Sequence, residues 1–276
     1  MDFLANVLKF LDYKITTPTP YGLFHIVSCV LVVLLTVALC VTHKKGDMKR
    51  PQLVLTVVAI VVTVLEIYKQ INYSFQYSDG IKFDFQWYAF PWQFCSMPMY
   101  VGLLASIIRK GKVHDSLCAF LATYSVFAGL SVMAYPNTVF IDTLGVDIQT
   151  MVCHGTMIVV GVYLLYSGKV KAELKTILKA LPVFGVAVAM AAIMNEIAHL
   201  SGLLETETFN MFFISPYCEP SLPVYSLVQN VVPFPLCLVI YIIGFTIAAT
   251  LVLLVAIAAK RLVANIADRR RHKTNV

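Results

Sequence analysis

Charged residues are scarce in this 276-residue chain: they make up 13% of the positions, whereas hydrophobic residues make up 59%, and the mean hydropathy is +0.80. A typical soluble domain carries about 25% charged residues. This deficit excludes a soluble protein and predicts a chain that resides in lipid. No polar stretch is long enough to form a separate soluble domain, so residues 1–276 are expected to form a single membrane domain.

Paired cysteines and a signal sequence are also missing. The seven cysteines show no CxxC spacing, and all except Cys218 fall in apolar segments, which excludes a disulfide framework and a zinc-knuckle pattern. No basic stretch precedes an apolar core at the N-terminus, so we expect no cleaved signal peptide. The formal net charge of +6 arises from basic residues beside apolar segments. It therefore predicts membrane orientation rather than a nucleic-acid partner.

Seven apolar stretches are long enough to cross a bilayer, which needs about 20 residues per helix. They cover residues 21–41, 52–73, 92–108, 116–134, 149–167, 176–200 and 235–259. The sequence thus predicts an all-α, polytopic bundle of seven transmembrane helices. The third stretch is the shortest and contains Pro98. We expect a full helix that starts at Pro91, with a re-entrant element as the alternative.

Basic residues divide unequally between alternate connections of this bundle. Of the 21 Lys and Arg residues, seventeen lie in or beside the connections after the first, third and fifth stretches and in the C-terminal tail. Three lie on the opposite side, and Lys69 lies inside the second stretch. Because cytoplasmic connections carry most of the basic charge, we expect an odd number of spans, an outer N-terminus and a cytoplasmic C-terminus. The expected location is the cell membrane.

Polar side chains inside the expected spans gather toward the end that this orientation places outside. They are His25, Glu66, Lys69, Gln70, Gln93, Cys95, His154, Asn195, Glu196 and His199. Such residues are costly in a bilayer and mark functional sites. Spacings of three or four residues place Glu66 with Lys69, and Asn195 with His199, on one helix face. We expect one polar chamber that opens outward; alternatively, Glu66 and Lys69 form a structural pair at the interface, with Lys69 reaching toward water.

Cys95 is the strongest candidate nucleophile. A helix that starts at Pro91 would place Cys95 in its first turn, where free N–H groups and the helix dipole favour a thiolate. Such a position would lie about 6 Å below Pro91, near the depth of the ester groups of outer-leaflet lipids. The alternative is an inert, buried thiol, which is how we interpret Cys29, Cys40, Cys118 and Cys237.

The chain resembles the YwaF-type integral membrane family, whose eukaryotic relatives are transmembrane acyltransferases that remodel ether phospholipids. The resemblance covers most of the chain and rests on the seven spans and on short motifs. These are the segment Gly22, Leu23, Phe24, His25, the polar second span, Pro91 to Cys95, and the segment Cys153, His154, Gly155. The resemblance implies that Cys95 is an acylated nucleophile and that His154 is its partner. No family motif covers the sixth span.

These observations favour a lipid acyltransferase without a cofactor, which acts on a membrane phospholipid or lysolipid. Cys95 would be the nucleophile and His154 the general base, while His25, or His199 with Asn195, would orient the substrate or stabilise an oxyanion. Gln93 would belong to the same substrate-binding group.

Two other functions remain open. In a lipid hydrolase, His25, His154 and His199 would hold zinc while Glu196 activates water, although no HExxH-like spacing is present. In a transporter or a small-ligand receptor, Glu66, Lys69 and Glu196 would supply the binding charges.

A long connection, residues 201–232, is expected to form a structured lid over the chamber. It contains three acidic residues, several aromatic residues and several prolines, among them Glu205, Glu207, Glu219, Phe209, Phe212, Phe213, Tyr217, Pro216, Pro220 and Pro223. Its apolar residues should pack near His199.

Overall fold

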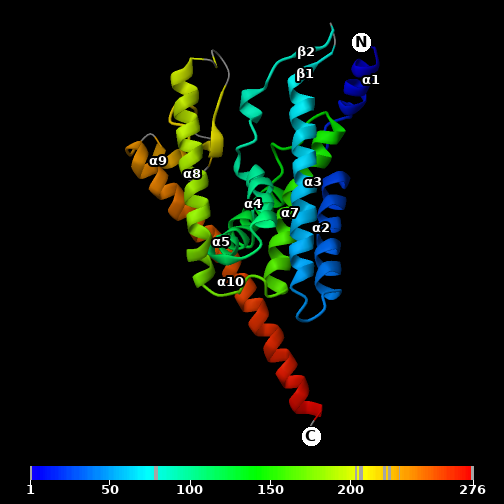
Figure 1. Ribbon diagram of the computed structural model, residues 1–276, viewed down its shortest axis with the longest axis vertical. Helices are drawn as coiled ribbons and strands as arrows, with labels where there is room; N and C mark the ends of the chain where they lie inside the picture. The colour runs from blue at the N-terminus through cyan, green and yellow to red at the C-terminus, as the bar shows by residue number, and fades with distance from the viewer. Residues whose placement is uncertain are drawn as a thin grey trace.

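The computed structural model describes residues 2–77, 80–202, 204, 208–219, 222, 225–229 and 231–274. The fold is almost entirely helical, and the chain runs from α1 at one end of an elongated bundle to the far end of α10 (Figure 1). The longer helices are α2 (Leu23–Val41), α3 (Lys49–Ser74), α7 (Leu144–Tyr166), α8 (Lys175–Ser201) and α10 (Phe234–Thr274).

Shorter elements complete the fold. The helices are α1 (Asp2–Leu11), α4 (Met97–Ile107), α5 (Gly111–Leu121), α6 (Tyr124–Ala134) and α9 (Ser226–Gln229), and the 3-10 turns are η1 (Trp87–Ala89), η2 (Phe94–Ser96) and η3 (Met211–Phe213). The two short strands β1 (Phe75–Gln76) and β2 (Lys82–Phe83) pair in antiparallel fashion, with Phe75 opposite Phe83. This hairpin extends the end of α3 that lies beside α1 (Figure 1).

Six helical segments of the described chain are long and apolar enough to cross a membrane. They are α2, α3, α7, α8, the first 30 residues of α10, and α5 with α6, which together form one segment, Gly111–Ala134. The break between α5 and α6 lies at Thr123, whose φ of −131° and ψ of −81° are not helical. The expectation of a polytopic helical membrane protein is therefore confirmed.

The expectation of a full third span, residues 92–108, is wrong. Only α4, which has 11 residues, is an α-helix there, and its length of about 16 Å is half of a bilayer core. Pro98 explains the difference: it lies in the first turn of α4, where its missing N–H costs no hydrogen bond. A helix that began at Pro91 would have Pro98 in its interior. The depth inferred for Cys95 from such a helix therefore does not hold.

The centre of the bundle is α7, which packs against α2, α3 and α6, while α8 packs against α5. Small residues allow the closest approaches. A side chain at Gly161 of α7 would meet Val126 of α6 at 2.0 Å, and one at Gly155 would meet Val32 of α2 at 2.4 Å. Glycine at these two positions therefore sets the distance between α7 and its neighbours.

An aromatic cluster joins the second half of the bundle. The ring of Phe184 in α8 lies 4.5 Å from Tyr124, 5.5 Å from Phe94 and 5.7 Å from Phe245, measured between centroids. Phe184 and Tyr124 are fully buried, with 0% of their surface exposed. Phe94 immediately precedes Cys95, so the insertion of Phe94 into this cluster fixes the position of η2.

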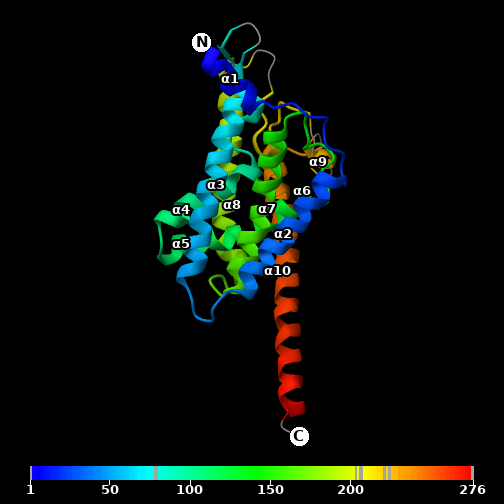
Figure 2. The same ribbon diagram turned by 90° about the vertical axis from the view of Figure 1, so that its right-hand side faces the viewer.

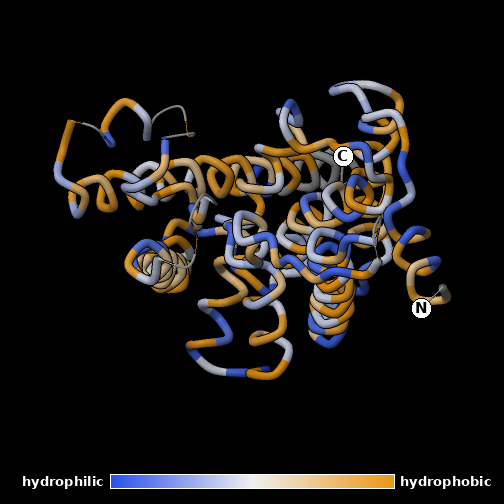
Figure 3. Tube along the Cα trace, turned by 90° about the horizontal axis from the view of Figure 1, so that it is seen from above, coloured by the Kyte–Doolittle hydropathy of each residue, from blue (hydrophilic) through white to orange (hydrophobic). Residues whose placement is uncertain are grey.

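The outer helix faces are apolar, as expected for contact with lipid. Within α2, all of which the structure describes, His25 is the one buried residue, and Leu23 and Val33 are 79% and 60% exposed. Viewed from above, hydrophobic residues predominate along the helices, and many hydrophilic ones lie in the connections (Figure 3). The C-terminal part of α10 extends beyond the other helices (Figure 2).

Candidate functional site

A buried ionic cluster lies between α3 and α7. Lys69 Nζ is 2.7 Å from Glu66 Oε1, and Gln70 Nε2 donates a hydrogen bond of 3.0 Å to the same oxygen. From α7, Gln149 Nε2 donates to Glu66 Oε2 at 3.5 Å. The side chains of Lys69 and Glu66 are only 14% and 7% exposed, so Lys69 does not reach out to water. The part of the alternative that has Lys69 reaching toward water is therefore wrong, whereas the pairing of Glu66 with Lys69 is present.

Two cysteines adjoin this cluster. Gln149 Nε2 also donates to Cys153 Sγ at 3.4 Å, one turn along α7. Cys95, in η2, lies within electrostatic range of Glu66, Lys69 and Cys153, and its side chain is partly accessible. The sequence pattern also placed Cys95 in one group with Glu66 and Lys69. It missed Gln149 and Cys153, although an amide at the start of an apolar span was an available signal.

His154 lies one residue beyond Cys153 and is almost buried, at 8% exposure. Its Nδ1 is 2.7 Å from the carbonyl oxygen of Thr150, which can only accept a hydrogen bond. In the neutral ring the proton is therefore on Nδ1, and Nε2 carries the lone pair of a base. Cys95 and His154, both of which the structure describes, form no hydrogen bond with each other, but the charge of Lys69 acts on both.

Gln93 and Asn195 hold the connection between α8 and α10 by paired amide bonds. Gln93 Nε2 donates to the carbonyl of Asn210 at 3.0 Å, and its Oε1 accepts the N–H of Phe212 at 3.1 Å. Asn195 of α8 does the same with Met211, at 3.1 and 2.8 Å. Because the nitrogen and the oxygen of each amide both bond to backbone, these residues position η3 and the turn beside Cys95. Asn195 also lines the cavity beside His199.

Glu196 and His199 lie on an outer part of α8. Tyr217 donates a hydrogen bond of 2.6 Å to Glu196 Oε2, and its ring stacks on His199 at 3.5 Å between centroids. A cavity of about 380 Å³ lies beside them, and Asn195, His199 and Phe209 are among its lining residues. The described part of the expected lid therefore packs near His199, whereas Glu205, Glu207, Pro220 and Pro223 lie outside the described residues.

His25 occupies a separate position at the start of α2. Its Nε2 lies 3.0 Å from the carbonyl oxygen of Met133, near the C-terminal end of α6, and its Nδ1 accepts the N–H of Tyr21 at 3.3 Å. The ring also lies 6.0 Å from that of Phe140. His25 therefore ties α2 to the end of α6, which is a packing role.

The polar residues expected to form one chamber are thus divided among several locations. His25, His154 and His199 contact different elements, and across the described residues no three His, Cys, Asp or Glu side chains are grouped to hold a metal ion. The zinc site expected as an alternative is therefore not assembled. What remains together is the cluster of Glu66, Lys69, Gln149, Cys95 and Cys153, which we call the α3–α7 site, with His154 beside it.

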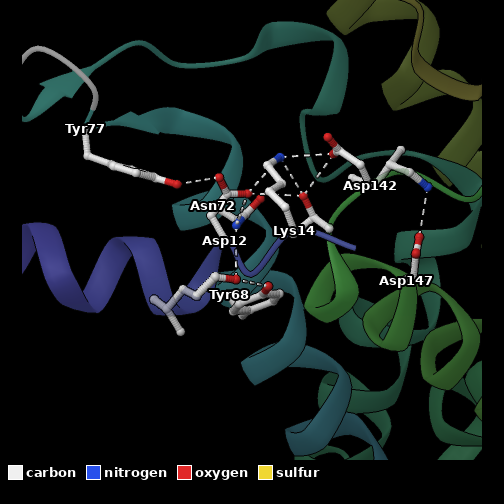
Figure 4. Close-up of polar contacts among 10 residues, drawn as sticks. Asp12, Lys14, Tyr68, Asn72, Tyr77, Asp142 and Asp147 are labelled. Atoms are coloured by element: carbon white, nitrogen blue, oxygen red, sulfur yellow. Dashed lines mark hydrogen bonds and ion pairs between the residues drawn. The ribbon is translucent and has the colours of Figure 1, made fainter. Parts of the chain in front are cut away.

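A second polar cluster, absent from the sequence-based expectations, ties the N-terminal segment to the start of α7 (Figure 4). Lys14 Nζ lies 3.1 Å from Asp12 Oδ1 and 3.0 Å from Asp142 Oδ1, and it donates to Thr143 Oγ1 at 2.9 Å. Tyr77 from the hairpin donates to Asp12 Oδ2 at 2.8 Å. These residues border an open depression of about 450 Å³. Loop residues carry no periodic pattern, so the sequence offered no signal for this contact.

The charges of this second cluster are coupled. Partial burial would raise the pKa of Asp12, but hydrogen bonds from Tyr77 and Lys14 and the charge of Lys14 outweigh it and lower that pKa. Burial would likewise lower the pKa of Lys14, but its contacts with Asp142 and Asp12 raise it. Both shifts favour the charged forms. The cluster is therefore an ion-pair contact at neutral pH that holds the N-terminal segment in place.

Comparison with known families gives one match. The model of the TMEM164 family matches residues 19–257, which include every helix that adjoins the α3–α7 site. No curated protein and no solved structure matches the chain. Because the match extends over far more than half of the sequence, the chain belongs to the TMEM164 family.

Proposed function

We propose that this protein is a membrane lipid acyltransferase that forms an acyl-thioester on Cys95. The observation that carries the proposal is the α3–α7 site itself. It combines a partly accessible thiol, a buried ammonium group within electrostatic range and a histidine whose Nδ1 is engaged by Thr150. A thiolate is stabilised by a nearby cation, and a histidine held through Nδ1 presents Nε2 as a base.

The proposed reaction is an acyl transfer in two steps. The Cys95 sulfur attacks the carbonyl of a donor ester, the thiol proton passes through His154 Nε2 to the departing oxygen, and the ester C–O bond breaks to give a thioester and a lysolipid. A hydroxyl or amine of an acceptor lipid then attacks the thioester, and its proton returns to the Cys95 sulfur. One ester is exchanged for another ester or an amide, so the reaction needs no cofactor.

The ion pair has a positioning role in this proposal. Glu66 holds the Lys69 ammonium group, Gln70 donates a hydrogen bond to Glu66, and Gln149 links the pair to Cys153 on the helix that carries His154. Lys69 would stabilise the thiolate before attack and the carbonyl oxyanion during it. Because Cys95 and His154 are not hydrogen-bonded here, the two side chains would have to approach each other when substrate binds, before the proton is transferred. Catalytic hydrogen bonds commonly tighten only when substrate is bound.

We also propose the membrane orientation on which the choice of donor depends. The N-terminus would lie outside the cell membrane and the C-terminus in the cytoplasm, and α4 with the non-helical segment before it would complete a seventh passage. Non-helical backbone is tolerated in a bilayer when protein surrounds it, and the carbonyl of Ala89 accepts a bond of 2.8 Å from Gln70. Cytoplasmic acyl-CoA could not reach an outward-facing site, so a phospholipid would be the donor.

Intact mass measurement of the protein purified from cells tests the proposal. The expected result is an added fatty acyl mass that hydroxylamine removes. Cys95→Ala should abolish this adduct and His154→Ala should slow its formation. Cys237→Ala removes a buried thiol of α10 that contacts Val228 and Val232 instead, and it should leave the adduct intact. A Cys95→Ala protein with undiminished lipid-remodelling activity would contradict the acyltransferase function.

Transport or small-ligand binding is the second candidate function, because a buried ion pair in a membrane helix is typical of substrate and ion pathways. In that case Lys69→Met would abolish ligand binding or uptake, while Cys95→Ala would have no effect. The two functions are therefore separated by the Cys95 variant.

A further inference from the structure

An apolar groove of about 670 Å³ runs between α6, α7 and α10, on a different side of α7 from the cluster that contains Glu66. Its walls are formed by aliphatic side chains, among them Val126, Leu130, Val162 and Val255. Val255 is 70% exposed and Leu130 is 42% exposed, so the groove opens to the lipid phase. In a membrane protein such a concave apolar surface is filled by acyl chains.

The groove results from the path of α10. This helix packs mainly against α6 and α8 rather than α7, and small residues, Ala256 and Ala259, face the gap. From Phe234 to Lys260 the helix rises by about 40 Å, which is the thickness of a bilayer with its head-group regions. Lys260 therefore lies at head-group depth when the start of α10 lies at the opposite surface.

Lys260 and Tyr166 close one end of the groove, and both belong to its lining. Tyr166 is the last residue of α7 and is 58% exposed, in the manner of aromatic residues at a membrane surface. Arg261 follows Lys260, and the adjoining connection after α7 carries Lys169 and Lys171 with a single acidic residue, Glu173. The apolar groove thus ends in a region of net positive charge.

We propose that this groove is a binding site for one acidic glycerophospholipid, with an acyl chain against α6, α7 and α10 and the phosphate on Lys260. An acyl chain would lie along the apolar wall, and the positive end would select a head group with net negative charge over a zwitterionic one. The site lies in the leaflet at the C-terminal end of α10. It is independent of the acyl transfer proposed for Cys95. A lipid bound there would stabilise α10 in its position beside α6 and α8 and away from α7.

Native mass spectrometry of the detergent-purified protein, titrated with phosphatidylglycerol or with phosphatidylcholine, tests this site. We expect tighter retention of phosphatidylglycerol, and Lys260→Gln should weaken it about fivefold, as expected for one basic residue at a lipid surface. Lys45→Gln is the matched control, because Lys45 is an exposed cation in the connection between α2 and α3. That variant should retain the lipid as the wild type does.

A second pair of variants tests the groove through its shape. Ala256→Trp places a large ring in the gap and should abolish retention, whereas Leu254→Trp, on a face of α10 that does not line the groove, should not. Equal retention of both lipids by the wild type would overturn the proposal, as would equal losses from Lys260→Gln and Lys45→Gln. Retention unaffected by Ala256→Trp would place the lipid elsewhere and would also overturn it.

Discussion

Neutralising Glu66 should destabilise the protein much more than neutralising an exposed carboxylate. Glu66→Gln keeps the size of the side chain and an oxygen that can accept from Gln70, but it leaves the charge of Lys69 without its partner at 2.7 Å. Both side chains of the pair are nearly buried, at 14% and 7% exposure. Removing one member of a buried pair costs about 3–5 kcal/mol. We therefore expect a loss in this range.

The exposed pair Lys14–Asp142 provides the matched comparison. Its atoms are 3.0 Å apart, but the two side chains are 54% and 60% exposed. Exposed pairs contribute about 0–1 kcal/mol, so Asp142→Asn should have little effect on global unfolding. The double variant Glu66→Gln, Lys69→Met removes both buried charges and should recover most of the stability lost by Glu66→Gln, since no uncompensated charge remains.

These effects are measured by unfolding the protein in mixed detergent micelles with increasing sodium dodecyl sulfate. The fluorescence of the two tryptophans reports the unfolding. The expected order of unfolding midpoints places Glu66→Gln lowest, with the double variant and Asp142→Asn closer to wild type. A Glu66→Gln midpoint equal to that of wild type would show that the buried pair does not stabilise the fold. A double variant less stable than Glu66→Gln would show that Lys69 does not need the carboxylate as its partner.

Phe184→Ala should cost about 3–5 kcal/mol of stability, because this ring is fully buried, whereas Ile197→Ala on the lipid-facing side of the same helix should change the unfolding midpoint little. The pKa of Asp12 is lowered in the folded protein, so its contribution to stability is present above the ordinary value of 3.8 and is lost as the pH falls through the folded value. Proteolytic release of the N-terminal segment should therefore rise in acid. Asp12→Asn should raise this release already at neutral pH. Asn195→Ala removes both amide bonds to Met211, so hydrogen exchange at η3 should accelerate while exchange in α3 stays unchanged.

The membrane class and most of the helices could be predicted because they depend on local composition. Long apolar stretches have no alternative to helix in lipid, since the backbone must satisfy its hydrogen bonds within each segment. The apolar stretches correctly predicted α2, α3, α7, α8, α10 and the segment of α5 with α6. The presence of Glu66 and Lys69 on one face of α3 follows equally from helical periodicity, and their 2.7 Å contact agrees with it.

The tertiary structure decided what periodicity could not. The path before α4 depends on Gln93, which binds backbone groups more than a hundred residues away, and on Phe94, which inserts among rings from α5, α8 and α10. Likewise, His25 and His199 lie in similar apolar sequences to His154, but only packing determined that they contact Met133 and Tyr217. Sequence fixes which groups are costly in lipid, because that cost belongs to each residue. Which partner satisfies each group depends on how the helices pack, and a single sequence does not encode that in any local pattern.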